Sequence, residues 1–287
     1  MIIVVAPQAF KGSLSSKEAA SAMADGAQSV FPQAKIVKVP VADGGDGTLE
    51  TLIDATDGEF FSATVSGPLS EPVSALWGET GDKRTAVIET ARACGLVLLP
   101  ENKRDPRFTT TYGAGELIKE ALDLGYRRFI LGIGGSSTND GGAGLAQALG
   151  ARLINTSGES LPRGGSALLS LAHIDLSDLH PAVHASKFLI ANDVTNPLIG
   201  PQGAAAVYGP QKGATPDMVA LLDQALEHLA KVIYQDLGRE IKDIPGSGAA
   251  GGMGGGLLAF LGGKFFGGAD LVLDSIDLNA TLATADL

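Results

Sequence analysis

Residues 127–150, RRFILGIGGSSTNDGGAGLAQALG, decide the fold class of this protein. The apolar run at 129–133 is short and rich in large aliphatic side chains, which predicts a buried strand. A polar loop with many glycines follows, and AGLAQALG (143–150) then predicts a helix. A strand, a glycine loop and a helix in this order are the unit of a mostly parallel α/β sheet.

Further strands and helices alternate along the chain in the same way. Ser15 and Glu18 predict a capping box at the start of the first helix. Residues 60–67 and 73–79 predict an antiparallel pair, which interrupts the parallel pattern. The predicted fold class is therefore α/β. The other predicted strands are 2–6, 35–41, 85–89 and 187–191, and the other predicted helices lie within 10–31, 115–124 and 215–238.

Composition and charge exclude several classes of protein. The chain has 287 residues, of which 45% are hydrophobic, 5% are aromatic and 39 are glycines, as in α/β proteins rich in tight turns. A net charge of -11 makes nucleic acid and anionic membranes unfavourable partners. The single cysteine, Cys94, lies in an apolar segment and is predicted to be a buried, unreactive thiol. No signal peptide or membrane-spanning run is recognisable, so the expected location is cytoplasmic.

Polar side chains gather directly after the predicted strands. VADGGDGTLE (41–50) places Asp43 and Asp46 on a glycine-rich turn. Because ligands of open α/β sheets bind beyond the carboxyl ends of the strands, these side chains are predicted to line one shared cleft. The alternative for each position is an ordinary turn or a helix cap. The other members of the set are Lys11, Glu89, Asn139, Asp140, Asn192 and Asp193.

The loop at 132–145 predicts a phosphate site. Glycines allow backbone N–H groups to approach an anion closely. A carboxylate beside a phosphate is repulsive unless a cation lies between them, so Asp140 together with Asp46 predicts a Mg²⁺ site. The residues predicted to bind the nucleotide cofactor are Gly134, Gly135, Ser136, Ser137, Thr138, Asn139, Gly141 and Gly142.

Lys212 is a second candidate for phosphate binding, because YGPQKGATP (208–216) places it between glycine and proline turns. A solvated loop lysine is the alternative. GSGAAG (246–251) has the spacing of a dinucleotide fingerprint, but no convincing strand precedes it, so its glycines are predicted to permit close helix packing or a second approach to the nucleotide. No Walker A sequence is present, which excludes phosphoryl transfer of the P-loop kind.

Several long strings of this sequence closely resemble the bacterial glycerate kinase family that makes 2-phosphoglycerate. The resemblance covers nearly the whole chain, in the order of the family. The strings are APQAFKGSLSS (6–16), PVADGGDGTLE (40–50), AVIETARACGL (86–96), RFTTTYGAGELI (107–118), GGSSTNDGGAG (134–144), DVTNPLIGPQGAAAVYGPQKGAT (193–215) and GAAGGMGGGL (248–257).

The resemblance implies phosphorylation of D-glycerate that depends on ATP and Mg²⁺. It also implies two α/β domains around a central cleft, one of them discontinuous. We place the first domain at 1–58 and 112–186 and the second at 59–111 and 187–287. The expected partner is D-glycerate as a small-molecule substrate, without nucleic acid or membrane, and a homodimer is left open.

The sequence departs from the family at three points. Asp46 stands where the family usually has glutamate, and Ser137 stands where alanine is common. The family continues with a further segment that contains a TGEG-type turn, so one domain is expected to be incomplete at its C-terminus. A second expectation therefore stays open, namely a nucleotide-binding or sugar-acid-binding fragment without activity.

Roles can be assigned by separating the cations from the carboxylates. Lys11 and Lys212 are predicted to neutralise phosphate oxygens. Asp43, Asp140 and Asp193 are predicted to divide two tasks, holding Mg²⁺ and accepting the proton of the attacking hydroxyl, with Asp193 as the base. Arg104, Arg107 and the threonines of TTTYG (109–113) are candidates for the glycerate carboxylate or a phosphate. The alternative reaction is that of another phosphotransferase, not of the P-loop kind, or of a phosphatase.

Overall fold

A six-stranded sheet forms the centre of the protein, in the strand order β10-β9-β6-β5-β4-β3. The structure is a computed structural model, and it describes residues 1–10, 13–45, 47–276 and 278–287. The strands of this sheet are β3 (Glu59–Ser66), β4 (Pro72–Glu79), β5 (Thr85–Glu89), β6 (Arg128–Gly132), β9 (Lys187–Ala191) and β10 (Lys264–Phe266).

The four strands β10, β9, β6 and β5 are parallel, and β4 and β3 continue the sheet in antiparallel pairing. In register, Ile88 of β5 faces Leu131 of β6, and Leu131 faces Ile190 of β9. These three side chains belong to the main core, whereas the neighbouring row of Val87 and Ile130 belongs to a smaller core on the other face. Parallel strands need cover on both faces, so the continuous apolar runs of this sequence suit a central position.

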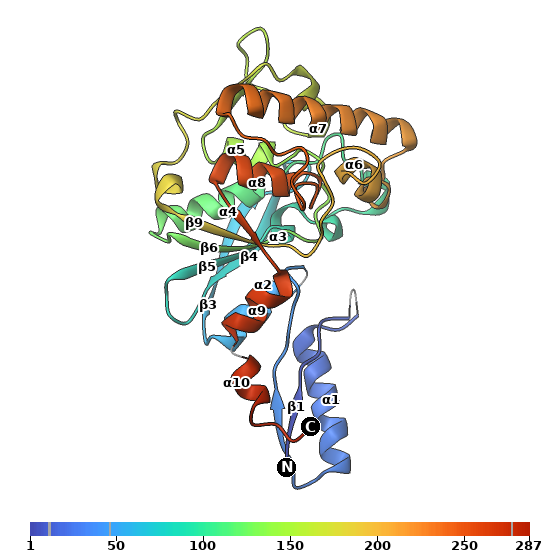
Figure 1. The fold of residues 1–287 in the computed structure, drawn as a ribbon, viewed down its shortest axis with the longest axis vertical. Helices are drawn as coiled ribbons and strands as arrows, with labels where there is room; N and C mark the ends of the chain where they lie inside the picture. The colour runs from blue at the N-terminus through green and yellow to red at the C-terminus, as the bar shows by residue number, and fades with distance from the viewer. Residues whose placement is uncertain (11–12, 46, 277) are drawn as a thin grey trace.

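Helices cover both faces of the sheet (Figure 1). The helices α4, α5, α7 and α8 contribute side chains to the main core, and α2 and α9 contribute to the smaller core. Figure 1 shows α2 and α9 on the side of the sheet that faces the N-terminus. The bounds of these helices are α2 (Thr48–Ala55), α4 (Tyr112–Asp123), α5 (Ala143–Ala148), α7 (Pro216–Leu237), α8 (Met253–Leu261) and α9 (Gly268–Ser275).

The N-terminal segment forms a separate small unit, in which β1 (Ile2–Val5) and β2 (Lys35–Lys38) pair in parallel and α1 (Ser16–Val30) connects them. The C-terminal end of the chain returns to this unit, because the Val4 amide donates to the Leu287 carbonyl at 2.8 Å. Both termini and α10 (Leu278–Leu282) therefore lie beside β1 (Figure 1). The remaining short elements are α3 (Ala91–Cys94), α6 (Ala204–Tyr208), β7 (Arg152–Ile154) and β8 (His173–Asp175).

The structure confirms the α/β class and the strands and helices predicted from the sequence. The capping box is present, since the Glu18 amide donates to Ser15 Oγ at 3.2 Å and the Ser15 amide donates to the Glu18 carboxylate at 2.8 Å. Cys94 is fully buried, and burial raises the pKa of its thiol to about 12. The short strands β7, β8 and β10 and the helices α3, α6, α8, α9 and α10 were not predicted.

The predicted domain boundaries stay predictions. The sheet takes strands from both predicted domains, because β6 of the range 112–186 lies between β5 and β9 of the other range. Within the described ranges, none of the helices combines the length and the apolar character needed to cross a membrane.

Helix α8 packs on bare backbone. A Cβ atom on Gly256 would lie 2.2 Å from the carbonyl oxygen of Gly141, and one on Gly251 would lie 1.9 Å from that of Thr138. Gly251 and Gly256 therefore permit close packing against the 134–142 loop, and for Gly251 of GSGAAG (246–251) this fits the first of the two predicted alternatives, close packing.

Gly256→Ala is expected to lower the free energy of unfolding by roughly 1–3 kcal/mol, because the methyl group meets the Gly141 carbonyl. The matched control is Gly26→Ala in α1, where no heavy atom lies within 4 Å of the added Cβ. This control should raise the free energy of unfolding by about 0.5–1 kcal/mol through the helix propensity of alanine. Urea denaturation measures both changes, and equal effects of the two variants would contradict the packing argument.

Candidate functional site

A cavity of 490 Å³ opens beyond the carboxyl ends of β6 and β9. It brings together residues from seven separate stretches of the chain between Asp43 and Ala250, which supports the predicted shared cleft. The lining residues with charged or polar side chains are Asp43, Arg104, Ser136, Asn192, Asp193, Tyr208, Gln211 and Lys212.

Asp43 reaches this cavity from outside the six-stranded sheet, since it follows β2 of the N-terminal unit. Its turn lies directly on the backbone of the larger sheet: a Cβ on Gly44 would lie 2.8 Å from the Ala191 Cβ, and one on Gly134 would lie 2.8 Å from the Gly45 Cα. Gly44 also has a φ of +90°, a conformation that side chains disfavour. The Asp43 side chain is exposed and accepts a hydrogen bond from the Gly45 amide at 3.1 Å.

Asp193 follows β9, and its side chain lies against Gly268, the first residue of α9. Its Oδ1 accepts a hydrogen bond from the Gly268 amide at 2.8 Å. The position that a Cβ on Gly268 would take lies 1.9 Å from the Asp43 carbonyl oxygen and 2.9 Å from Asp193 Oδ2. Gly268 therefore allows the two predicted aspartates to share one wall of the cavity.

Lys212 is 2% exposed and lies against the glycine loop. Its ammonium donates hydrogen bonds to the Thr138 carbonyl at 2.7 Å and to Ser136 Oγ at 3.1 Å. Burial lowers the pKa of Lys212 to about 8, although the neighbouring Cys94 and Asp140 act in the opposite direction. The predicted solvated alternative for this lysine is wrong, because the side chain is buried.

The structure divides the predicted phosphate loop into two parts. Gly134, Gly135 and Ser136 line the cavity, and Gly135 has a φ of +73°. The second part is buried away from the cavity, where a Cβ on Gly141 would lie 2.3 Å from Leu229 Cδ2 of α7. The predicted residues of this second part, Ser137, Thr138, Asn139, Gly141 and Gly142, do not line the cavity.

Asp140 is 1% exposed and belongs to the buried part. Its Oδ2 accepts hydrogen bonds from the Thr111 amide at 2.8 Å, the Thr111 hydroxyl at 2.9 Å and the Gly144 amide at 3.3 Å, and Oδ1 accepts one from the Gly142 amide at 3.2 Å. Burial raises the pKa of the Asp140 carboxyl, and the hydrogen bonds from Thr111, Gly142 and Gly144 act to lower it. This geometry makes Asp140 a brace of the loop rather than a lining group of the cavity.

Glu89 also lies away from the cavity. It is 3% exposed at the end of β5, and its Oε2 accepts hydrogen bonds from the Gly47 amide at 3.2 Å and the Leu49 amide at 3.3 Å at the start of α2. Its Oε1 lies 3.2 Å from Arg92 Nε. These two hydrogen bonds fit the helix-cap alternative for Glu89. Two predicted residues, Lys11 and Asp46, lie outside the described residues.

Several lining residues were not among the predicted site residues, including Tyr208, Gln211, Leu96 and Val97. Tyr208 and Gln211 stand in the same quoted turn as Lys212, so their proximity to that lysine was the available signal. Leu96 and Val97 follow β5 in an apolar segment that carries no chemical signal. Val97 is 83% exposed at the cavity, a position that periodicity does not reveal.

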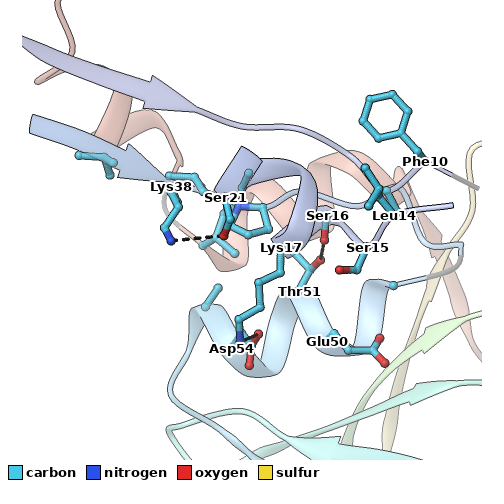
Figure 2. A pocket seen from close by; sticks show the side chains of 18 of the residues that line it. Phe10, Leu14, Ser15, Ser16, Lys17, Ser21, Lys38, Glu50, Thr51 and Asp54 are labelled. Atoms are coloured by element: carbon cyan, nitrogen blue, oxygen red, sulfur yellow. Dashed lines mark hydrogen bonds and ion pairs between the residues drawn. The ribbon is translucent and has the colours of Figure 1, made fainter. Parts of the chain in front are cut away.

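A larger cavity of 1050 Å³ lies between α1, β2 and α2 (Figure 2). Its polar side chains pair with one another: Lys17 with Asp54 at 2.9 Å, and Ser16 with Thr51 at 3.2 Å. Figure 2 shows these pairs joining α1 to α2. Because these two pairs engage polar groups of the cavity in holding α1 against α2, this cavity is the weaker candidate for chemistry, despite its size.

The cavity beyond β6 and β9 fits Mg²⁺ only if bound phosphate oxygens and water supply part of the metal coordination. Among the described residues there is no group of three or more His, Cys, Asp or Glu placed to hold a metal ion. Mg²⁺ commonly binds through one or two carboxylates together with substrate phosphates and water. Asp43 and Asp193 provide such a pair beside the glycine loop, so these residues fit a cation that phosphate oxygens help to hold.

Comparison with known proteins gives one consistent result. The model of the glycerate kinase family matches residues 3–287. A glycerate kinase of Bacillus subtilis is 53% identical over 287 residues, which are 100% of this chain and 75% of that protein. A glycerate 2-kinase of Escherichia coli is 50% identical over 278 residues, covering 97% of this chain and 73% of that protein.

A solved structure shares the fold. The crystal structure from Salmonella typhimurium LT2 that carries the name glycerate kinase 2 superimposes with a TM-score of 0.92 at 49% sequence identity. The match covers 100% of this chain and 76% of that one.

Asp140→Asn is expected to lower the free energy of unfolding by about 1–3 kcal/mol. The NH₂ group of asparagine would replace a carboxylate oxygen and face the N–H and O–H donors that now bind it. The Mg²⁺ dependence of nucleotide binding should stay as in the native protein, since Asp140 does not line the cavity. Urea denaturation and calorimetry measure the two properties. Asp217→Asn, at an exposed site, is the control, with a change within about 0.5 kcal/mol. Loss of the Mg²⁺ dependence at unchanged stability would instead support a metal-binding role for Asp140.

Proposed function

The chain belongs to the glycerate kinase family and is a kinase, and on this premise we propose that it phosphorylates D-glycerate at the 2-hydroxyl with ATP and Mg²⁺. The relative from Escherichia coli is named glycerate 2-kinase, which supports the choice of hydroxyl. The proposed products are 2-phosphoglycerate and ADP.

One observation carries the proposal: a single cavity combines exposed backbone of a glycine loop, a buried lysine and two exposed aspartates. Phosphoryl transfer needs little covalent chemistry from the protein, but it needs positioned positive charge and a group that accepts the hydroxyl proton. The glycine loop, Lys212 and a cation held by Asp43 would supply the first requirement, and Asp193 would supply the second.

The proposed step follows from these groups. The 2-hydroxyl oxygen of glycerate attacks the γ-phosphorus of ATP, and the bond from this phosphorus to the bridging oxygen of the departing ADP breaks. Asp193, held by the Gly268 amide, accepts the hydroxyl proton. Lys212 and the backbone of 134–136 hold the phosphate oxygens as charge moves toward ADP.

Asp43 is proposed to hold the metal, with Asp46 as a further candidate, and Lys11 is proposed to neutralise phosphate oxygens; Asp46 and Lys11 lie outside the described residues. When bound, Mg²⁺ would neutralise charge on the phosphate oxygens. The Asp43 carboxylate is exposed to the cavity and its turn is fixed on the backbone of β9 by Gly44, so the ligand would be held without rearrangement of the sheet.

Asp43→Asn and Asp193→Asn are each expected to lower kcat by about 10²–10⁴-fold, with little change in Tm because both side chains are exposed. A coupled ADP-release assay with ATP, Mg²⁺ and D-glycerate measures turnover, and phosphorus NMR identifies the product. Near-native turnover in both variants would refute the roles of the aspartates. A phosphate on the 3-hydroxyl would refute the proposed product, and phosphate release without glycerate would indicate a phosphatase.

The value of kcat/KM is expected to fall as the pH rises through about 8, because burial lowers the pKa of Lys212 to that value and the neutral amine no longer attracts phosphate. Lys212→Arg should remove this alkaline decline, since a guanidinium keeps its proton.

The same pKa shift affects stability, because Lys212 releases its proton at a lower pH in the folded protein than in the unfolded chain. Its contribution to stability is therefore full above pH 10.5 and is lost as the pH falls to about 8. A flat activity profile of the native protein from pH 7 to 10 would contradict the role of Lys212.

A further inference from the structure

The cavity contains two cations among its described lining residues, Lys212 and Arg104. The same lining includes the carboxylates of Asp43 and Asp193. A substrate that carries a carboxylate of its own is repelled by these aspartates unless a positive charge meets it. The cavity therefore needs a counter-charge for the substrate, in addition to the charge that meets the phosphates.

Lys212 is already engaged. Two of the three donors of its ammonium bind Thr138 and Ser136 of the phosphate loop, at 2.7 and 3.1 Å. Lys212 is therefore held against the glycine loop and can interact with the phosphates proposed to bind there.

Arg104 is not engaged in this way. Among the described residues its charge partner is Glu101, with 3.9 Å between Nη1 and Oε1, and the Glu101 side chain is 90% exposed. Such a pair contributes little in water. The Nε of Arg104 is buried without a hydrogen-bond partner in the described part of the chain. A buried donor without a partner is costly, so a ligand that accepts from this guanidinium gains more than one that meets a solvated side chain.

The backbone of Arg104 is fixed beside the loop of Lys212. A Cβ on Gly213 would lie 2.4 Å from the Arg104 carbonyl oxygen and 3.0 Å from its Cβ, and Gly213 has a φ of +92°. The two cations of the cavity are thus held by neighbouring stretches of backbone in direct contact. The nearby Arg107 is different, because Asp105 accepts from its guanidinium at 2.7 to 3.2 Å.

We propose that Arg104 binds the carboxylate of the substrate and so selects a hydroxy acid over a neutral alcohol. A planar guanidinium meets a carboxylate with two parallel hydrogen bonds, which fixes the orientation of the acid as well as its charge. Lys212 and the glycine loop then hold the phosphates, while Arg104 holds the other end of the short substrate. The inference rests on D-glycerate as the substrate proposed above.

Arg104→Gln tests this role by calorimetry, with D-glycerate, D-glyceramide and ATP as separate ligands. D-Glyceramide replaces the carboxylate with a neutral amide. The variant should weaken D-glycerate binding by about 10–100-fold, as expected for charged hydrogen bonds. Binding of D-glyceramide and of ATP should stay within about threefold. Arg104→Lys keeps the charge without the planar fork and should give an intermediate loss. The control is Lys103→Gln, which removes an exposed positive charge one residue away and should change none of these affinities.

Three results would overturn the assignment: D-glycerate affinity unchanged in R104Q, an equal loss for D-glyceramide, or a loss for ATP as large as that for D-glycerate. Thermal melting verifies that R104Q is folded. If R104Q does not fold, R104K tests the same role, because native D-glycerate affinity in R104K would exclude the paired hydrogen bonds.

Turnover of the native protein separates this inference from the proposed function. If the native protein phosphorylates D-glycerate and R104Q binds it normally, only the role of Arg104 fails. If the native protein binds D-glycerate without phosphorylating it, the proposed function fails while the binding test still applies.

Discussion

Contact between bare backbone segments is the constraint on which this site depends. Gly44 and Gly45 lie on Ala191 and Gly134, and Gly268 lies on the Asp43 carbonyl, at distances that leave no room for a Cβ. These contacts bring a turn from the N-terminal unit to the end of the six-stranded sheet. Asp43 and Asp193 can face one cavity only because glycine permits that approach.

Burial separates the charges of the site into two kinds. Asp140 and Lys212 are almost completely buried and bind the loop at 134–144, so their cost of desolvation is offset by hydrogen bonds within the protein. Asp43 and Asp193 remain exposed on the cavity, where they can exchange partners with a ligand. A buried loop and exposed carboxylates therefore lie side by side, which suits the phosphate binding and proton transfer proposed for this cavity.

The alternation of elements was readable from the sequence because it follows from local chemistry. The apolar runs of β5, β6 and β9 predict buried strands, and the Ser15–Glu18 box and Pro216 mark helix starts. Strand β10 and helix α8 were missed, since KFF is short and a glycine-rich helix has little helix propensity of its own. Gly256 of α8 packs on the Gly141 backbone, and no local pattern contains that contact.

The sequence by itself determined the α/β class, the family, and the gathering of glycines, Asp43, Asp193 and Lys212 in loops. Only the tertiary structure decided which of these residues face the cavity. Asp140 and Asp43 both stand in glycine turns after strands, yet one is 1% exposed and bound by Thr111, and the other is exposed. The tertiary structure also left Arg104 without a strong partner while Arg107 pairs with Asp105. Sequence fixes the chemistry of a side chain, but its desolvation and its partners come from distant segments, and these decide whether a charge supports the fold or meets a ligand.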